Sequence, residues 1–522
     1  MNAFMTARRA GAALWLSTLV LVVSAPFARA DVKLSPMFGD HMVLQQGMPV
    51  PVWGTADANE EVTVTLGGQT AKATADGSGK WVAKLAPLTA SSQPAQLTVK
   101  GKNEVAIKDV LVGEVWVCSG QSNMEMNVAS SLRAEQERNE AANYPNVRMF
   151  TVEKAVAGKP LTMLKGSWEV SGPQTVGRFS AVGYFFGREL HKQLGVPVGL
   201  IHTSWGGTPA ESWATAEALA ADPDFKPIVD RWNQQFADFG KQLGQLSQSI
   251  AQWQGSAAGQ SGTPTPDAPL PADPRSNPWR PSGLYNAMIA PVVPYAIKGA
   301  TWYQGESNAG RAYQYRKLLP AMIGSWRKAW GQGEFPFLIV SLANFTPVKD
   351  EPGDSDWAEL REAQTLTANQ PNNGQSITID IGDAVDIHPK NKQEVGRRLA
   401  LVALANSYKK DVPFAGPTYE SMTAEGDTVV LKFKNTYGGL SAKGADTLKG
   451  FAVAGEDHKW HWADAKIAGS DTVVVHSDKV SKPVAVRYAW ANNPVCNLYN
   501  KADLPAVPFR TDDWKGVTAD AR

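Results

Sequence analysis

Cysteine is nearly absent from this chain, which has Cys118 and Cys496 in 522 residues. Two cysteines exclude a fold stapled by several disulfides. Cys118 lies in an apolar run, so we expect a small buried hydrophobe there, although an exported chain permits a Cys118–Cys496 bridge. Also lacking are His, Cys and Asp clusters at metal-ligand spacing and a glycine-rich phosphate loop. No metal or cofactor is therefore expected.

Long apolar runs are absent except at the start of the chain. Arg8 and Arg9 precede the apolar stretch 10–25, and Ala28-Arg29-Ala30 has the small residues of a cleavage site. This order predicts a signal peptide over residues 1–30 and an exported protein, periplasmic or secreted. The stretch is short for a membrane span of about 20 residues, so no membrane association is expected after cleavage.

An excess of charge of either sign is missing as well. The chain has 51 Lys and Arg against 50 Asp and Glu, and loss of the three arginines in residues 1–30 leaves a net charge of −2. Such a balance favours neither nucleic acid nor an anionic membrane as partner. The sequence does not indicate an oligomeric state.

About 490 residues after the signal peptide are too many for a single core. Residues 31–107 carry short alternating runs separated by turns, which predicts an N-terminal β-sandwich. Residues 108–411 alternate apolar runs with helical stretches, which predicts an α/β domain with a parallel sheet covered on both faces. Residues 412–522 return to β runs and predict a C-terminal β-sandwich.

Six strands and four helices are expected in the α/β part. The strands are Val112–Cys118, Val147–Val152, Val198–His202, Ile297–Trp302, Phe337–Leu342 and Ile377–Ile381; the helices are Ala181–Leu194, Tyr313–Trp330, Trp357–Asn369 and Lys392–Tyr408. Residues 214–282 form an insertion, helical to about 254 and then rich in Gly, Ser and Pro. The apolar stripe of Leu243, Leu246, Ile250 and Trp253 in this insertion is expected to pack against the protein.

The stretch 115–124, Val-Trp-Val-Cys-Ser-Gly-Gln-Ser-Asn-Met, organises the functional prediction. An apolar strand breaks into a turn, and Ser122 follows the turn, where a hydroxyl can face a substrate. The pattern is not the G-x-S-x-G elbow, because Met124 replaces the second glycine. A serine is a weak nucleophile alone, so it needs a base and oxyanion donors.

His388 is the candidate base, and an aspartate near it would hold its tautomer. Asp386 lies two residues before His388 and Asp383 five before. Many hydrolases with this arrangement place the acid three residues before the histidine, but Val385 occupies that position. Asp386, Asp383 and a Ser122–His388 dyad without an acid all remain open.

Four blocks, in this order along the chain, resemble the sialate O-acetylesterase family, carbohydrate esterases of the SGNH-hydrolase kind. They are Gly120-Gln-Ser-Asn-Met124, Trp205-Gly-Gly-Thr208, Trp302-Tyr-Gln-Gly-Glu-Ser307 and Asp386-Ile-His-Pro389. Further similarity takes in 357–364, 498–500 and 508–511, so nearly all of the chain after residue 30 is covered. The resemblance implies an SGNH, flavodoxin-like α/β core and favours Asp386 as the acid.

The resemblance also implies a serine esterase that removes O-acetyl groups from sugars, with an O-acetylated glycan as partner. We expect an oxyanion hole made by the N–H of Ser122, the N–H of Gly207 in preference to Gly206, and the amide of Gln304, with Asn308 as the alternative. Asn123, Trp205, Glu306 and Asn308 are expected at the substrate, with Glu306 as an orienting group. The substrate itself is open between sialic acid and plant polysaccharides such as xylan or xyloglucan, and an inactive carbohydrate-binding protein is the other alternative.

Aromatic and basic side chains extend the hypothesis of a sugar site. Trp205, Trp213 and Trp302 flank the motif loops, where aromatic faces suit sugar rings. Arg361 and Arg510 are candidates for binding a sialate carboxylate.

Overall fold

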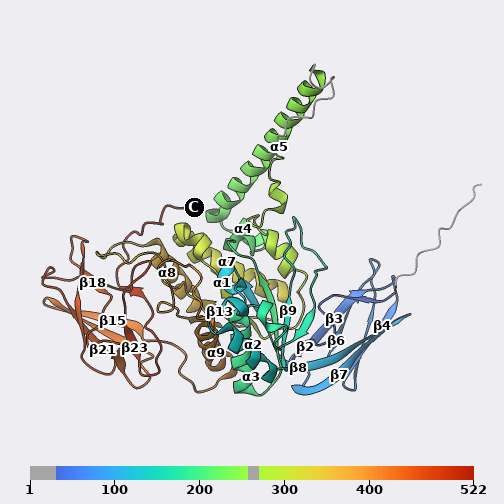
Figure 1. Cartoon of the computed structure of the whole chain (residues 1–522), viewed down its shortest axis with the longest axis horizontal. Helices are drawn as coiled ribbons and strands as arrows, with labels where there is room; N and C mark the ends of the chain where they lie inside the picture. Colours follow the sequence, from blue (N-terminus) through green and yellow to red (C-terminus); the bar gives the residue numbers. More distant parts are fainter. Residues whose placement is uncertain (1–30, 257–269) are drawn as a thin grey trace, which may run out of the picture.

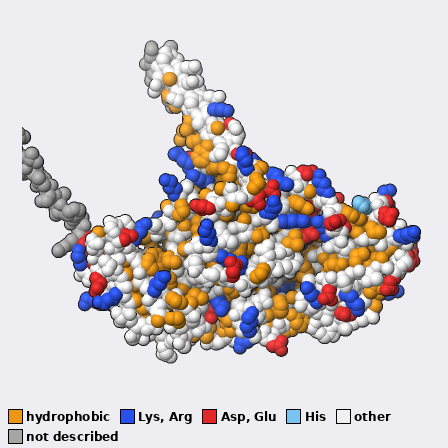
Figure 2. All heavy atoms as spheres, turned by 180° about the vertical axis from the view of Figure 1, so that it is seen from behind, with side chains coloured by type: hydrophobic (Ala, Val, Ile, Leu, Met, Phe, Trp, Pro, Cys, Tyr) orange, Lys and Arg blue, Asp and Glu red, His pale blue; other side chains and the backbone are white. Residues whose placement is uncertain are grey.

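The computed structural model describes residues 31–256 and 270–522. The predicted signal peptide and part of the Gly/Ser/Pro-rich loop lie outside these ranges. Figure 1 shows three parts side by side, with an α/β region between an N-terminal and a C-terminal β region. Among the residues described, no helix is both long and apolar enough to cross a membrane. Acidic and basic side chains are interspersed over the face in Figure 2, as the balanced composition predicts.

The N-terminal region consists of two layers of strands around a buried apolar core. One sheet contains β1 (Lys33–Leu34), β3 (Val50–Thr55) and β6 (Lys80–Leu85); the other contains β2 (Val43–Gln45), β4 (Glu61–Leu66), β5 (Gln69–Thr74), β7 (Ser91–Lys100) and the start of β8 (Glu104–Gly120). In β4 the residues Val62, Val64 and Leu66 are buried and alternate with more exposed ones. This period of two is what places one face of the strand in the core.

Strand β8 joins the N-terminal region to the α/β region. Its first half pairs with β7 and β2, and its second half pairs with β11 (Val198–Ser204) and β12 (Gly299–Tyr303). The boundary expected between residues 107 and 108 therefore falls inside one continuous strand. Because both sheets share β8, the N-terminal region fixes the strand that ends at the serine turn.

The central sheet has the strand order β10-β9-β11-β8-β12-β13-β14. Its remaining strands are β9 (Val147–Thr151), β10 (Trp168–Val170), β13 (Phe337–Val340) and β14 (Asn373–Ser376). All neighbours are parallel except β10, which runs antiparallel at one edge. A mixed α/β architecture with a parallel core and flanking β regions is thereby confirmed.

Helices cover both faces of this sheet, as a parallel sheet requires. The helices of the region are α1 (Ser122–Glu125), α2 (Ala134–Glu140), α3 (Ala181–Leu194), α4 (Ala216–Ala221), α5 (Lys226–Gly255), α7 (Ala312–Trp330), α8 (Asp356–Ala368) and α9 (Lys392–Tyr408). Alternate residues of β8 point to opposite faces: Trp116 and Cys118 lie in the core with α3 and α9, while Val115 and Val117 lie in the core with α7 and α8. Cys118 is fully buried and both cysteines are free, so Cys118 is a small core residue.

No strand forms at Ile377–Ile381, so the prediction of a strand there is wrong. The last strand of the sheet, β14, covers Asn373–Ser376 and ends just before Ile377. Ile377 and Ile379 are buried in the apolar core of the C-terminal β region instead. The apolar run thus reflects contact between two regions of the chain and not a strand.

Helix α5 projects away from the body of the molecule (Figure 1). Ile228 and Trp232 at its base are buried, but Leu243 and Ile250 further along are 40% and 39% exposed. The stripe of Leu243, Leu246, Ile250 and Trp253 lies on the outer part of the helix, which leaves the protein surface. The expectation that Leu243 and Ile250 pack against the body is wrong.

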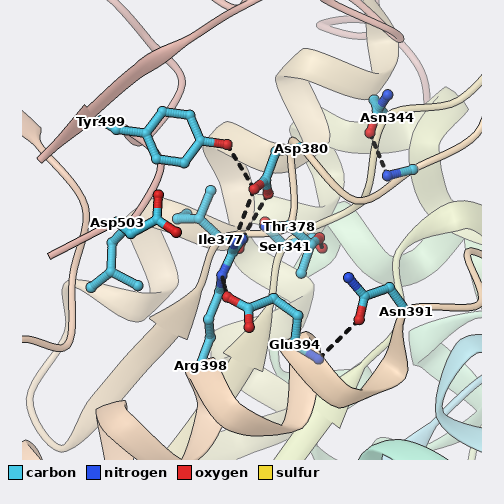
Figure 3. Close-up of polar contacts among 12 residues, drawn as sticks. Ser341, Asn344, Ile377, Thr378, Asp380, Asn391, Glu394, Arg398, Tyr499 and Asp503 are labelled. Atoms are coloured by element: carbon cyan, nitrogen blue, oxygen red, sulfur yellow. Dashed lines mark hydrogen bonds and ion pairs between the residues drawn. The ribbon is translucent and has the colours of Figure 1, made fainter. Parts of the chain in front are cut away.

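The C-terminal β region consists of three small sheets. They contain β15 (Thr418–Glu425), β16 (Thr428–Lys434), β21 (Thr472–His476) and β20 (Asp464–Ile467); β19 (Trp460–Trp462), β18 (Phe451–Ala454), β22 (Ala485–Tyr488) and β24 (Phe509–Arg510); and β17 (Leu440–Ala442) with β23 (Leu498–Asn500). Figure 3 shows how this region is tied to the α/β region. Asp380 accepts hydrogen bonds from Arg398 of α9 at 2.7 and 2.8 Å and from the hydroxyl of Tyr499 of β23 at 2.7 Å.

Candidate active site

Three of the four motif loops begin at the same level of the sheet. In the parallel register, Gly120 at the end of β8 lies beside Ser204 at the end of β11 and Tyr303 at the end of β12. The carboxyl ends of parallel strands form one edge, where α/β proteins place their sites. The strand register therefore brings the serine turn, the glycine loop and the 304–308 loop together, as the sequence predicts.

The turn before Ser122 requires glycine at position 120. Gly120 has φ +142, and a Cβ there would lie 2.2 Å from the carbonyl oxygen of Tyr303. The amide of Gln121 donates to this oxygen at 3.0 Å, which fixes the turn against β12. Ser122 then begins α1 half-buried, and its own N–H has no acceptor within the described ranges. Such an N–H at a helix start is available to an anion.

The two glycines of the glycine loop differ in their hydrogen bonds. The N–H of Gly206 donates to Oε2 of Glu125 at 2.5 Å, and a Cβ at Gly206 would lie 3.3 Å from the Cβ of Ser122. Gly207 adopts φ +73 and has open space around it. Its N–H finds no acceptor in the part of the chain that is described. The geometry therefore favours Gly207 over Gly206 as an oxyanion donor.

Gln304 and Asn308 lie behind the loops and not at a substrate. Nε2 of Gln304 donates to Thr208 O at 3.2 Å and to Oδ1 of Asn308 at 2.7 Å, and its Oε1 accepts from Tyr315 at 2.8 Å. Nδ2 of Asn308 donates to Glu211 at 2.9 Å. Both residues are almost fully buried. Their amides hold the glycine loop against the 304–308 loop, which departs from the expected role as oxyanion donors.

The His388 loop brings one of the two candidate acids, Asp386, to the imidazole. Nδ1 of His388 lies 3.5 Å from Oδ1 of Asp386, which also accepts the backbone N–H of His388 at 2.8 Å. Asp383 points elsewhere, because its Oδ1 accepts the backbone N–H groups of Val385 at 2.8 Å and Asp386 at 3.3 Å. The contacts thus favour Asp386 as the partner of the imidazole and Asp383 as a brace of the turn.

His202, which lies near the same edge of the sheet, is unsuited to act as a base. It is buried, and desolvation lowers its pKa to about 4. Its Nε2 contacts Oγ of Ser204 closely. The imidazole is therefore neutral and already engaged in the core.

Asn123 connects the serine turn to the His388 loop. Its Nδ2 donates to Oε1 of Glu306 at 2.7 Å and to Ile387 O at 3.0 Å. Glu306 is a buried carboxyl group whose pKa is raised by desolvation, although Asn123 and the charges of Lys392 and His388 oppose the shift. Its Oε2 has no hydrogen-bond partner among the described residues. Asn123 and Glu306 therefore organise the site from within and leave little of their surface to a substrate.

Of the three tryptophans expected to contact sugar, only Trp205 is suitably placed. Trp213 and Trp302 are 0% exposed and contact each other edge to face, so they belong to the core. Trp205 is partly exposed, and Nζ of Lys154 lies 5.3 Å from its ring centre.

The arginines expected to bind a carboxylate are also engaged. Arg361 is 1% exposed and donates to the carbonyls of Leu342, Ala343, Ala491 and Asn492. Arg510 donates to Glu362 at 2.8 Å and to Asp512 at 3.3 Å. Both arginines stabilise contacts with the C-terminal region, and neither has a free face for a sialate.

Two residues of the site were missed by sequence reasoning. Glu125 directly follows the quoted serine motif, and Lys392 begins a helix whose bounds were predicted correctly. The only available signal was a charged residue close to a motif, which on its own indicates a solvated surface. Within the described residues, no group of three or more His, Cys, Asp or Glu could hold a metal ion.

Comparison with known proteins gives the same assignment from independent observations. The family model described as "Carbohydrate esterase, sialic acid-specific acetylesterase" matches residues 112–257 and 275–405. Sialate O-acetylesterase of Rattus norvegicus is 31% identical over 94% of this chain and 96% of its own length. The Homo sapiens protein of the same name is 29% identical over 91% and 92%. A carbohydrate acetylesterase from Xanthomonas citri matches in structure with a TM-score of 0.79 and 36% identity, over 93% of this chain and all of that one.

The fold and the site are those of a carboxylic ester hydrolase, a carbohydrate O-acetylesterase. The chain belongs to the carbohydrate esterase, sialic acid-specific acetylesterase family, so the resemblance seen in the sequence is confirmed.

Proposed function

We propose that the protein is an SGNH-type serine esterase in which Ser122 is the nucleophile, His388 the general base and Asp386 the orienting acid. The observation that carries the proposal is the shared register of β8, β11 and β12, which brings Ser122 and the glycine loop to one edge. The hydrogen bond from Asn123 to Ile387 O ties the His388 loop to the same edge. Residues 108–411 form the catalytic unit, flanked by the β regions 31–107 and 412–522.

The reaction runs in two steps with one proton carrier. Oγ of Ser122 attacks the acetyl carbonyl carbon and gives its proton to His388. The N–H groups of Ser122 and Gly207 donate to the oxyanion. The bond from the carbonyl carbon to the sugar oxygen breaks, and His388 returns the proton to that oxygen. Water then attacks the acetyl-enzyme, His388 takes and returns a proton, and acetate leaves.

We propose an acetylated sialic acid as the substrate, because the curated relatives from rat and human carry the name sialate O-acetylesterase. The ring of Trp205 offers an apolar face to the sugar. Arg361 and Arg510 are engaged elsewhere. The cation we propose for the sialate carboxylate is Lys154 beside Trp205, whose side chain is 42% exposed although its ammonium pairs with Glu125 at 2.5 Å. An acetylated plant polysaccharide has no carboxylate at this position and would gain nothing from the Lys154 ammonium.

The test is acetate release from acetylated sialosides and acetylated xylan or xyloglucan, by wild type and Ser122→Ala. The serine variant should lose roughly 10⁴- to 10⁶-fold in kcat, the range measured when triad members of a serine protease are removed. Retained turnover in Ser122→Ala would refute the mechanism. Faster turnover of the plant glycans would refute only the substrate. Export is checked separately, since the protein recovered from its producing cell should begin at Asp31.

A further inference from the structure

Lys392 is a charged side chain with no exposure to solvent, at the start of α9. A buried ammonium is costly unless it is paired and hydrogen-bonded. Its Nζ donates to Oδ1 of Asn123 and lies 5.2 Å from the ring centre of Tyr303 on β12. The carboxylates of Glu306 and Asp386 favour its charged form, while desolvation lowers its pKa to about 7. Lys392 is therefore held by contacts inside the protein and not by solvent.

The contact with Lys392 fixes the orientation of the Asn123 side-chain amide. A side-chain amide has one acceptor and one donor group with two hydrogens. Because Lys392 occupies Oδ1, the two hydrogens of Nδ2 point to Oε1 of Glu306 and to Ile387 O. Asn123 follows the nucleophile, and Ile387 precedes the base. In this orientation, the Asn123 amide sets the separation of the two loops that bear Ser122 and His388.

We infer that Lys392 is a positioning residue of the esterase reaction, which fixes Asn123 between the Ser122 turn and the His388 loop and supplies the counter-charge of Glu306. It touches no reacting atom. The inference rests on the proposed roles of Ser122 and His388. The groups that face Lys392 are Asn123 from α1, Tyr303 from β12, Glu306, and Asp386 from the His388 loop.

The decisive variant is Lys392→Met, which removes both the charge and the donor. Misplacement of catalytic groups by about 1 Å can cost about a hundredfold, so we expect kcat to fall by about tenfold to a hundredfold with KM nearly unchanged. Lys390→Met, which changes an exposed lysine of the same loop, is the matched control and should leave both unchanged.

Lys392→Gln separates the hydrogen bond from the charge. Glutamine can still donate to Asn123, so part of kcat should return, whereas the part that depends on the charge should stay lost. If Lys392→Met does not fold, this variant carries the test alone. A folded Met or Gln variant with the wild-type kcat would overturn the inference.

Labelling with a fluorophosphonate probe distinguishes a failure of the Lys392 inference from a failure of the proposed function. Oγ of the nucleophilic serine forms a bond to phosphorus as fluoride leaves, and the base takes the serine proton. Wild type should be labelled at Ser122, and Lys392→Met more slowly by the same factor as kcat. Failure of the wild type to label at Ser122 would remove the proposed function and this inference with it. Equal labelling rates of the two proteins would remove only the role of Lys392.

Discussion

The ammonium of Lys392 and the amide of Asn123 form a hydrogen bond inside the protein, one residue along the chain from Ser122, the proposed nucleophile. This bond joins the first turn of α9 to α1, which follows the end of β8, the strand that continues from the N-terminal region. The site is thus held by elements from the whole length of the α/β region, and its geometry depends on buried polar contacts as well as on the strand register. The predictions below test single contacts of this arrangement.

The first prediction concerns the acid that orients His388. Asp386→Asn should lower kcat strongly, since the corresponding change in a chymotrypsin-like triad costs about 10⁴-fold. Asp383→Asn should cost little, because asparagine keeps the Oδ1 that accepts from Val385 and Asp386. The measurement is kcat/KM for acetate release by the two variants. A larger loss for Asp383→Asn would exchange the two roles, and no loss for either would indicate a dyad of Ser122 and His388.

The second prediction concerns stability at low pH. Burial alone would raise the pKa of Asp380, but the hydrogen bonds and charge of Arg398 and the hydroxyl of Tyr499 outweigh it and lower the pKa (Figure 3). A carboxyl group with a lowered pKa stabilises the fold above its unfolded pKa, near 4, and this stabilisation is lost as the pH falls further. Asp380→Asn should therefore cost about 3 kcal/mol at pH 7, seen as a Tm lower by several degrees, and the difference should narrow below pH 4.

Asp503→Asn provides the control for this experiment, because Asp503 is an exposed partner of Lys443 at the same junction. An exposed pair contributes about 0–1 kcal/mol. Equal Tm shifts for the two variants would contradict a special role of Asp380.

Much of the fold could be predicted because its signals are local. The bounds expected for α3 and α9 are those observed, since caps and periodicity are properties of neighbouring residues. The absence of a strand at Ile377–Ile381 could not be predicted, because Ile377 and Ile379 are buried by the C-terminal β region, whose first strand begins only at Thr418. Apolar residues alone do not reveal which part of the chain covers them.

The site shows the same division between local and distant information. Ser122 and Gly207 were predicted from short motifs that follow β8 and β11, and the strand register brings these two motifs to one edge of the sheet. Gln304 was predicted to donate to the oxyanion, but its amide is hydrogen-bonded to Thr208, Asn308 and Tyr315. The partners of a side-chain amide depend on the tertiary structure, which a short motif does not show. Arg361 was misassigned for the same reason, since its partners are carbonyls that no sequence pattern marks.

The last prediction concerns Glu125, which holds the glycine loop. Its Oε2 accepts the N–H of Gly206 at 2.5 Å, and a Cβ at Gly206 would lie 3.3 Å from that of Ser122, so this contact holds the glycine loop beside the serine. Glu125→Ala removes the acceptor, so the Gly207 amide loses its fixed position and the oxyanion is held less well. Removal of one oxyanion donor costs about 10²–10³-fold in kcat elsewhere, so a loss of about tenfold to a hundredfold is expected for a displaced one. Glu125→Gln keeps an oxygen at the same place and should recover most of the activity. Steady-state kcat and KM of the two variants decide the matter: similar losses for Ala and Gln would show that the charge of Glu125, paired with Lys154, matters more than its hydrogen bond to Gly206.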